Sequence, residues 1–249
     1  MFPEFMACDT TFGVTKEQRN LFLFAGVDGN NKTFTAMRCF MPSKELRAYN
    51  WAMRAALPIL VTQKTLSLNH CIASDAEYAI YTPLRSMMNN VCYLQKSCHR
   101  LDKYHLFTKP WLETVSIKLG DDDTVRYNVK KLRNMISKIF DYVESESEMN
   151  STITHYKHFY SIIKKSLKSE PACISIEKII NTINNNLLYI SHYYFKDVIT
   201  FDFVGDSIAE AQNSGIKTGQ FKVTSNLNIN TSAGRQIKIT NQQSKKKNK

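Results

Sequence analysis

The first 45 residues alternate short apolar runs with polar turns. Three of these runs have β character: EFMACDTTF, RNLFLFAGVD and KTFTAMRCFMP. The last two are separated by DGNNK, whose Asp-Gly pair and asparagines favour a tight turn, so we expect an antiparallel hairpin. The first run leads into an acid, Asp9, which is costly on a buried strand unless it is paired, solvated or bound to a metal.

From residue 43 onward the apolar spacing becomes helical. SKELRAYNWAMRAALPIL predicts a helix, LSLNHCIAS predicts a short strand that leads into Asp75, and AEYAIYTPLRSMM predicts the next helix. The stretch NNVCYLQKSCHRLDKYHLF predicts a further strand with a basic and aromatic continuation. A second acid therefore lies where a strand ends and a helix begins.

Three helices with apolar stripes are predicted after the loop LGDDDTV, and a final helix is predicted at about residues 206–216. The chain ends in a lysine-rich segment, SKKKNK, for which we expect a flexible tail. The stripes are expected to be core, and their residues are Val129, Leu132, Ile136, Ile139, Phe140 and Val143, then Ile153, Tyr156, Tyr160, Ile163 and Leu167, then Ile176, Ile179, Ile180, Ile183, Leu187 and Ile190.

Composition narrows the class of protein and of partner. Of 249 residues, 43% are hydrophobic, which is enough for a sizeable core. Lys and Arg exceed Asp and Glu by 33 to 22, and the net charge of +11 suits a polyanion without identifying one. The six cysteines form no C-x-x-C pair, so we expect reduced thiols and no structural zinc. Neither a secretion signal nor a membrane span is indicated.

The order of predicted elements is that of the ribonuclease-H-like fold, an α/β fold with a mixed sheet flanked by helices. The first part of the catalytic core would span residues 1–110, a mainly helical insertion residues 111–195, and the last core segment, with the catalytic helix, residues 196–225. Residues 226–249 would form the basic tail. In this fold, acids at adjacent strand ends and on a flanking helix suit two divalent ions that activate the attacking oxygen and stabilise the leaving oxygen.

Five segments resemble, in this order, the catalytic region of Mutator-like element (MULE) transposases of the DDE type. They are CDTTFGVTKEQRNLFLFAGVDGNNKTFTAMRCF, AYNWAMRAALPIL, CIASDAEYAIYTPLRSM, CHRLDKYHL and GDSIAEAQNSGIKTG. The family has an aspartate on the first strand, a second that enters a helix, and a glutamate in an E-x-x-N segment after a helical insertion. The resemblance extends from about residue 5 to about residue 225.

Position by position, the resemblance implies that Asp9, Asp75 and Glu210 are the catalytic acids and metal ligands. They would hold two Mg²⁺ ions, for which Mn²⁺ could substitute; Asp9 would contact both ions, and the other two acids one each. Asn213 and Lys217 complete the last segment, Lys217 as a DNA contact.

Other interpretations of the acids stay open at this point. Asp9 could cap a turn through Thr10 or Thr11, and Asp75 could be the N-cap of its helix. Glu210 has competitors in Asp206 and in the three glutamates of YVESESEMN, which are Glu144, Glu146 and Glu148.

One position departs from the family pattern. Members commonly carry a C-x-x-H pair after an arginine; here Arg100 and His105 fit, but Asp102 occupies the place of the cysteine. Asp102 and His105 could support the site by hydrogen bonding, and His105 could equally be a structural histidine. DNA contacts are expected from Arg100 and Lys103 among interleaved basic and aromatic residues, the alternative being a solvated loop with its aromatics in the core. The other members of that set are Lys96, Tyr104, Phe107, Lys109 and Trp111.

The resemblance implies a nuclear transposase that cleaves DNA at transposon ends and transfers the released strand to target DNA, usually as a homo-oligomer. The family's zinc-finger spacing does not occur in this sequence, so we expect a truncated fragment of an element or a transposase-derived protein that binds DNA or regulates without cutting. A stand-alone nuclease of the same fold is a third hypothesis.

Overall fold

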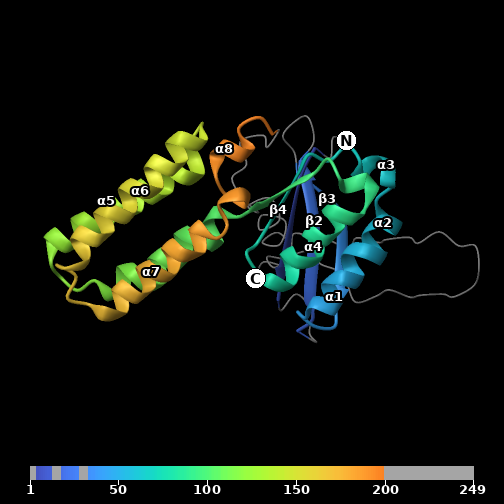
Figure 1. The fold of residues 1–249 in the computed structure, drawn as a ribbon. Helices are drawn as coiled ribbons and strands as arrows, with labels where there is room; N and C mark the ends of the chain where they lie inside the picture. Colours follow the sequence, from blue (N-terminus) through green and yellow to red (C-terminus); the bar gives the residue numbers. More distant parts are fainter. Residues whose placement is uncertain (1–3, 13–17, 28–32, 199–249) are drawn as a thin grey trace, which may run out of the picture.

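A computed structural model describes residues 4–12, 18–27 and 33–198 of the chain. Figure 1 shows two adjoining parts, a sheet with helices against it and an elongated group of helices beside it. The order predicted from the sequence, three strands, helix, strand, helix and strand, is present in the first part.

Within these described residues, five strands form one mixed sheet in the order β3-β2-β1-β4-β5. β1 (Phe5–Thr11) pairs antiparallel with β2 (Asn20–Val27), which pairs antiparallel with the edge strand β3 (Thr33–Met41). β4 (Cys71–Ser74) and β5 (Cys98–Leu101) run parallel to β1 on its other side. The predicted hairpin of the second and third strands is confirmed, and the carboxyl ends of β1, β4 and β5 meet at one end of the sheet.

Helices cover one face of this sheet (Figure 1). α1 (Leu46–Trp51), the π-helical segment η1 (Ala52–Ala56) and α2 (Leu57–Leu60) follow one another directly, and α3 (Gln63–Leu66) leads to β4. The wider turns of η1 precede Pro58, which has no N–H to donate to the preceding turn. Together with α4 (Tyr78–Asn90) these helices bury an apolar layer that includes Tyr49, Met53 and Leu84 against Met6 and Phe22.

The opposite face of the sheet carries a smaller apolar cluster. Phe5 and Ala7 of β1 lie there with Cys71 and Ala73 of β4, and Phe195 packs against them. Phe195 belongs to the short helix α8 (His192–Phe195), which follows the 3₁₀ turn η6 (Leu187–Tyr189). Alternate residues of one strand therefore enter two different cores, as the two-residue period of a strand requires.

The strand expected within residues 89–107 is present, and the basic and aromatic continuation after it is helical. The 3₁₀ turn η2 (Cys92–Leu94) comes first, and only Cys98–Leu101 form a strand. The π-helical segments η3 (Tyr104–Thr108) and η4 (Trp111–Val115) and the turn η5 (Ser116–Lys118) follow. The chain turns away from the sheet because Asp102 accepts the backbone N–H of His105 (2.8 Å) and the first helical turn begins there.

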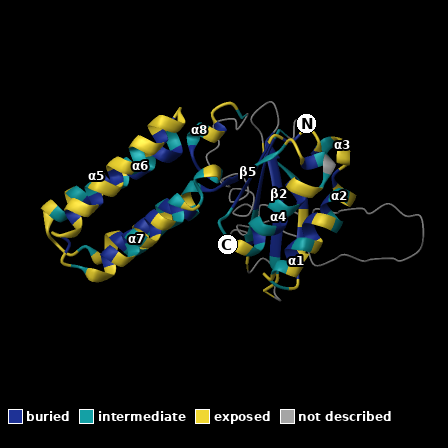
Figure 2. Cartoon of the chain, in the orientation of Figure 1, coloured by how far each residue is buried: buried dark blue, intermediate teal, exposed yellow. Residues whose placement is uncertain are grey.

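Three long helices, α5 (Asp123–Asp141), α6 (Glu146–Lys164) and α7 (Glu170–Asn184), form what we call the helical body. Asp122, Ser145 and Ser169 cap their N-termini. The predicted stripes of α5 and α7 are buried, whereas Ile153 of α6 is only partly so, and Leu187 falls in η6 because α7 ends at Asn184. Figure 2 shows these buried stripes facing inward along the bundle.

None of the helices in the described ranges is long and apolar enough to cross a membrane. Cys8, Cys39, Cys71, Cys98 and Cys173 are free thiols, as the absence of paired cysteine spacing predicted.

Candidate functional site

Three aspartates, Asp9, Asp75 and Asp102, lie in one row at the carboxyl ends of three neighbouring strands. Cys8 on β1 pairs with Ser74 on β4, and Ser74 pairs with Leu101 on β5. Each aspartate directly follows one of these three paired residues in the sequence. Neighbouring strands are about 4.8 Å apart. The backbone N–H of Asp102 continues the ladder by donating to the carbonyl oxygen of Ser74 (2.9 Å). We call these three residues the acid row.

Local hydrogen bonds hold one oxygen of each of the first two acids. The Oδ1 atom of Asp9 accepts the N–H of Thr10, and the Oδ1 atom of Asp75 accepts the N–H of Ala76, both at 2.6 Å. The Asp9 contact lies inside β1, which continues to Thr11, so it is not a turn cap. Asp75 is not the N-cap of α4, because that helix begins at Tyr78 and Glu77 is its capping residue.

The environment of Asp75 disfavours its charge. Burial raises the pKa of this carboxyl, and the negative charges of Asp9 and Asp102 raise it further, while His105 and the N–H of Ala76 act in the opposite direction. The side chain keeps 28% of its surface exposed, so the carboxylate remains accessible from solvent. Like-charged groups gathered at an accessible edge are typical of sites that bind cations or perform acid-base chemistry.

Asp102 and His105 join this cluster. The side chain of Asp102 is only 2% exposed, and its Oδ2 atom lies 3.0 Å from Nδ1 of His105, in addition to accepting that residue's backbone N–H. The same Nδ1 atom lies 3.9 Å from Oδ1 of Asp75. The structure thus brings the aspartate that replaces the family cysteine, and the histidine, next to Asp75; their supporting role in the chemistry stays a prediction.

A buried polar network beneath Asp75 was missed from the sequence. Nε of Arg85 donates to Nδ1 of His99 (3.0 Å), and Nε2 of His99 lies 2.7 Å from the hydroxyl of Ser74, which donates to the carbonyl oxygen of Asp75 (3.0 Å). The Arg85 guanidinium lies over the ring of Tyr189, 3.4 Å from its centroid. No sequence pattern indicated this network, because its members come from four separate elements of the fold, β4, α4, β5 and η6.

The expected DNA contacts Arg100 and Lys103 are engaged within the protein. Arg100 is 5% exposed, with its guanidinium 5.1 Å from the centroid of the Phe195 ring. Lys103 binds Asp141 and Ser137 of α5, at 2.5 and 2.9 Å. Neither cation is therefore presented on the surface as an open phosphate contact.

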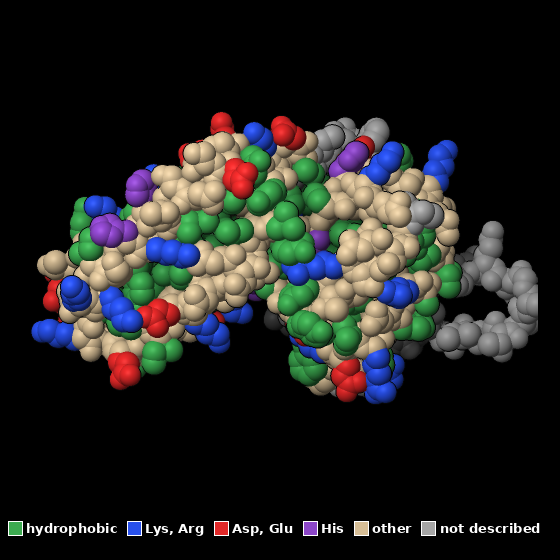
Figure 3. All heavy atoms as spheres, viewed as in Figure 1, with side chains coloured by type: hydrophobic (Ala, Val, Ile, Leu, Met, Phe, Trp, Pro, Cys, Tyr) green, Lys and Arg blue, Asp and Glu red, His purple; other side chains and the backbone are tan. Residues whose placement is uncertain are grey.

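The aromatic residues near these two cations divide between core and surface. Phe107 and Trp111 are buried in the core of the helical body, whereas Tyr104 is 48% exposed. On the face in Figure 3, lysines and arginines are spread over both parts of the molecule and do not gather in one patch. For Phe107 and Trp111, the alternative in which the aromatics belong to the core is correct.

The remaining predicted site residues cannot be placed beside the acid row. Glu210, Asn213, Lys217 and the competitor Asp206 lie outside the described residues. The other competitors, Glu144, Glu146 and Glu148, are exposed at the start of α6, where the side chain of Glu148 accepts the N–H of Glu144 (3.0 Å).

The chemistry of the acid row fits a hard divalent cation. Within the described ranges, no three His, Cys, Asp or Glu side chains are arranged so that they could hold a metal ion by themselves. Asp9 and Asp75 nevertheless supply the oxygen ligands that Mg²⁺ and Mn²⁺ prefer. A cation would also relieve the repulsion through which Asp9 raises the pKa of Asp75. A complete site would need a further ligand, as the expected role of Glu210 implies.

Comparison with known protein families agrees with this architecture. Residues 5–108 match the family model of the MULE transposase domain, and no curated protein matches the chain. The matched region includes all five strands, the helices on the covered face and the whole acid row. Residues 5–108 of this chain are therefore similar to MULE transposase domains over the whole sheet.

Proposed function

We propose that this chain is the catalytic domain of a MULE-type DNA transposase with a ribonuclease-H-like fold. It would cleave a phosphodiester bond at a transposon end and join the released strand to target DNA. The observation that carries the proposal is the acid row, in which Asp9 and Asp75 occupy adjacent strand ends of a mixed sheet within the MULE match. The sheet order β3-β2-β1-β4-β5 supports the fold assignment.

In this proposal Asp9 and Asp75 are metal ligands, and Glu210 completes the set. Two Mg²⁺ ions, or Mn²⁺ in their place, would supply Lewis-acid activation of water and stabilisation of the leaving oxygen. The residues of this chain hold those ligands in position: the N–H groups of Thr10 and Ala76 each fix one oxygen of the neighbouring carboxylate. Asn213 and Lys217 would act from the same segment as Glu210.

DNA is the proposed partner, and the nucleus is the proposed location. A net charge of +11 favours association with a polyanion, and a transposase domain implies work on DNA. Assembly as a homo-oligomer would bring two transposon ends together.

The experiment is cleavage and strand transfer by the full chain, with Mg²⁺ or Mn²⁺, on a labelled duplex that carries the terminal repeat. Asp9→Asn, Asp75→Asn and Glu210→Gln are each expected to lower the rate at least 100-fold, because each removes a negatively charged ligand that would hold a cation at the reacting phosphate. Asp121→Asn, which alters a fully exposed acid of the loop before α5, is the matched control and should keep the parent rate.

Activity that survives all three substitutions at the acids would overturn the site. DNA binding by the parent without cleavage would favour instead the inactive, DNA-binding or regulatory protein. Hydrolysis without strand joining would favour a stand-alone nuclease.

A further inference from the structure

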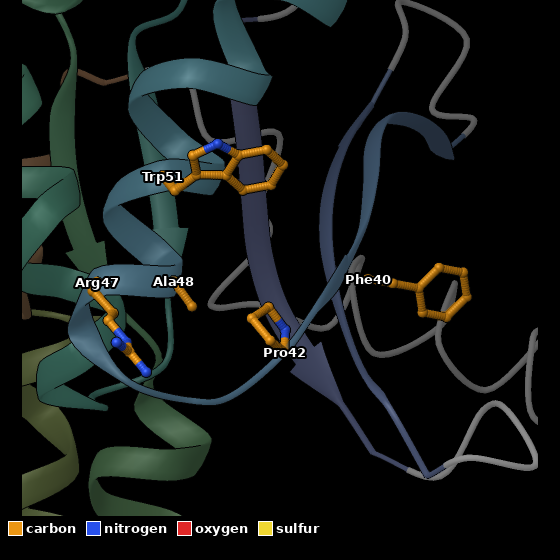
Figure 4. A pocket seen from close by; sticks show the side chains of 5 residues that line it. All are labelled: Phe40, Pro42, Arg47, Ala48 and Trp51. Atoms are coloured by element: carbon orange, nitrogen blue, oxygen red, sulfur yellow. The ribbon is translucent and has the colours of Figure 1, made fainter.

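A tryptophan is exposed beside a hollow at the end of the edge strand β3. The hollow has a volume of about 420 Å³, and its lining residues are Phe40, Pro42, Arg47, Ala48 and Trp51. Figure 4 shows the Trp51 ring extending from α1 toward the strands, with Phe40 turned away from the helix. Trp51 is 56% exposed, whereas Trp111 is 2% exposed in the helical body. Trp51 thus adjoins the apolar residues Phe40 and Pro42 around the hollow, and a contiguous exposed apolar patch with a polar border is typical of an interaction site.

Arginines border this tryptophan on the same helical face. Arg47, Trp51 and Arg54 are spaced four and three residues apart, which places them along one side of the helix, and all three are exposed. Arg47 also pairs with Glu45 (2.7 Å), a single acid beside the two arginines. A second hollow, of about 390 Å³, shares Phe40 and Pro42 with the first and adds Arg19 to the border.

This surface lies at the same end of the sheet as the acid row. Phe40 pairs with Leu21, and Leu21 pairs with Thr11, two residues beyond Asp9. Two strand spacings separate β3 from β1, a distance of about 10 Å. A ligand on the Trp51 surface is therefore within a few nucleotide lengths of the proposed catalytic acids.

We propose that Trp51, Arg47 and Arg19 form a binding surface for single-stranded DNA, in which a base stacks on the indole and phosphates contact the guanidinium groups. Aromatic faces with neighbouring cations are the recurring means by which proteins bind single strands. An apolar peptide would use the same ring, but the bordering arginines complement a polyanion better. The inference rests on the proposed function only in taking DNA as the partner, and it deepens that function by naming an unpaired segment near the site.

The two tryptophans provide a direct test that does not require catalysis. The full chain carrying Asp9→Asn is titrated with oligothymidylate in the presence of EDTA, and tryptophan fluorescence is recorded. We expect saturable quenching with the Trp51 protein and none with Trp51→Phe, in which the buried Trp111 is the remaining emitter. Trp51→Phe should still bind a labelled oligonucleotide, because a phenyl ring can stack on a base.

Binding of the labelled oligonucleotide is then compared among variants by fluorescence anisotropy. Trp51→Ala should weaken binding about ten-fold or more, and Arg47→Gln should reduce the slope of log affinity against log salt by about 0.7. The matched control is Tyr127→Ala, which removes an exposed ring on α5 and should leave the affinity unchanged.

Equal affinity of Trp51→Ala and the parent would overturn the proposal, as would an affinity for duplex DNA equal to that for the single strand. Quenching without any cleavage activity in the parent would overturn the proposed function and leave this surface standing. Cleavage by the parent without quenching would overturn the Trp51 surface and leave the proposed function standing.

Discussion

Nε2 of His99 lies 2.7 Å from the hydroxyl oxygen of Ser74, the residue that precedes Asp75 of the acid row. Because Arg85 can only donate to Nδ1 of this ring, Nε2 carries the proton and donates to Ser74. The Ser74 hydroxyl then donates to the carbonyl oxygen of Asp75. The neutral imidazole thus links α4 to the backbone that carries the second proposed catalytic acid.

His99 should make stability fall in acid. Burial, and then the charge of Arg85, lower the pKa of His99 to about 3, below its unfolded value near 6.5. The unfolded chain therefore takes up a proton first, and the stability contributed by neutral His99 is present above pH 6.5 and lost as the pH falls toward 3. Urea unfolding should show a loss of about 2 kcal/mol between pH 7 and pH 5 from this residue.

The comparison that isolates this effect is with His99→Gln, which has no titrating ring. Its unfolding free energy should fall by about 2 kcal/mol less than that of the parent over the same pH range. His158→Gln alters an exposed histidine of α6 and should follow the parent. Parallel curves for His99→Gln and the parent would contradict the prediction.

Asp75→Asn should stabilise the metal-free protein at neutral pH. Since burial and neighbouring carboxylates raise the pKa of Asp75, its ionisation lowers the stability of the fold as the pH rises above the unfolded pKa, and the loss is complete above the folded pKa. The amide keeps an oxygen for the N–H of Ala76 and removes the charge, so a gain of about 1 kcal/mol is expected in urea unfolding.

Divalent ions should reverse the order of stability of the parent and Asp75→Asn. Mg²⁺ or Mn²⁺ should raise the thermal midpoint of the parent by binding the folded state, and should shift that of Asp75→Asn much less. A variant less stable than the parent in EDTA, or one with an equal metal-induced shift, would count against the cation site.

The contact between Lys103 and Asp141 should stabilise the attachment of the helical body. Both side chains are about three-quarters buried, at 21% and 25% exposure, and Ser137 donates to the same carboxylate oxygen. Asp141→Asn should cost about 1 kcal/mol in chemical unfolding, because it leaves a mostly buried ammonium with a weaker partner.

The matched control for this pair is Asp121→Asn. The side chain of Asp121 is 100% exposed and that of its partner Arg126 is 52% exposed. The free energy of unfolding should therefore change by no more than about 0.5 kcal/mol. Equal costs for the two substitutions would show that the Lys103 contact adds nothing beyond a surface pair.

Much of the local structure was predictable because it depends on neighbours in sequence. The turn residues between β2 and β3 and the helical spacing of Leu132 and Ile136 indicated the correct elements. The position of Asp9 near the end of β1, and that of Asp75 just after β4, followed from the lengths of the apolar runs. The strand around Cys98 was predicted, but the helical turns that follow it were not, since a short mixed run does not distinguish an irregular continuation from a buried helical turn.

The sequence by itself determined the apolar stripes, the strand and helix order and the types of residue available for chemistry, because these depend on local periodicity and side-chain identity. Only the tertiary structure decided that Asp102 stands in line with Asp9 and Asp75, that Arg100 is buried, and that His99 reaches Ser74. Those relationships depend on the pairing of β1 with β4 and β4 with β5 across long stretches of chain. Non-local strand pairing leaves no periodic signal in the sequence, since it is selected by the packing of the whole sheet.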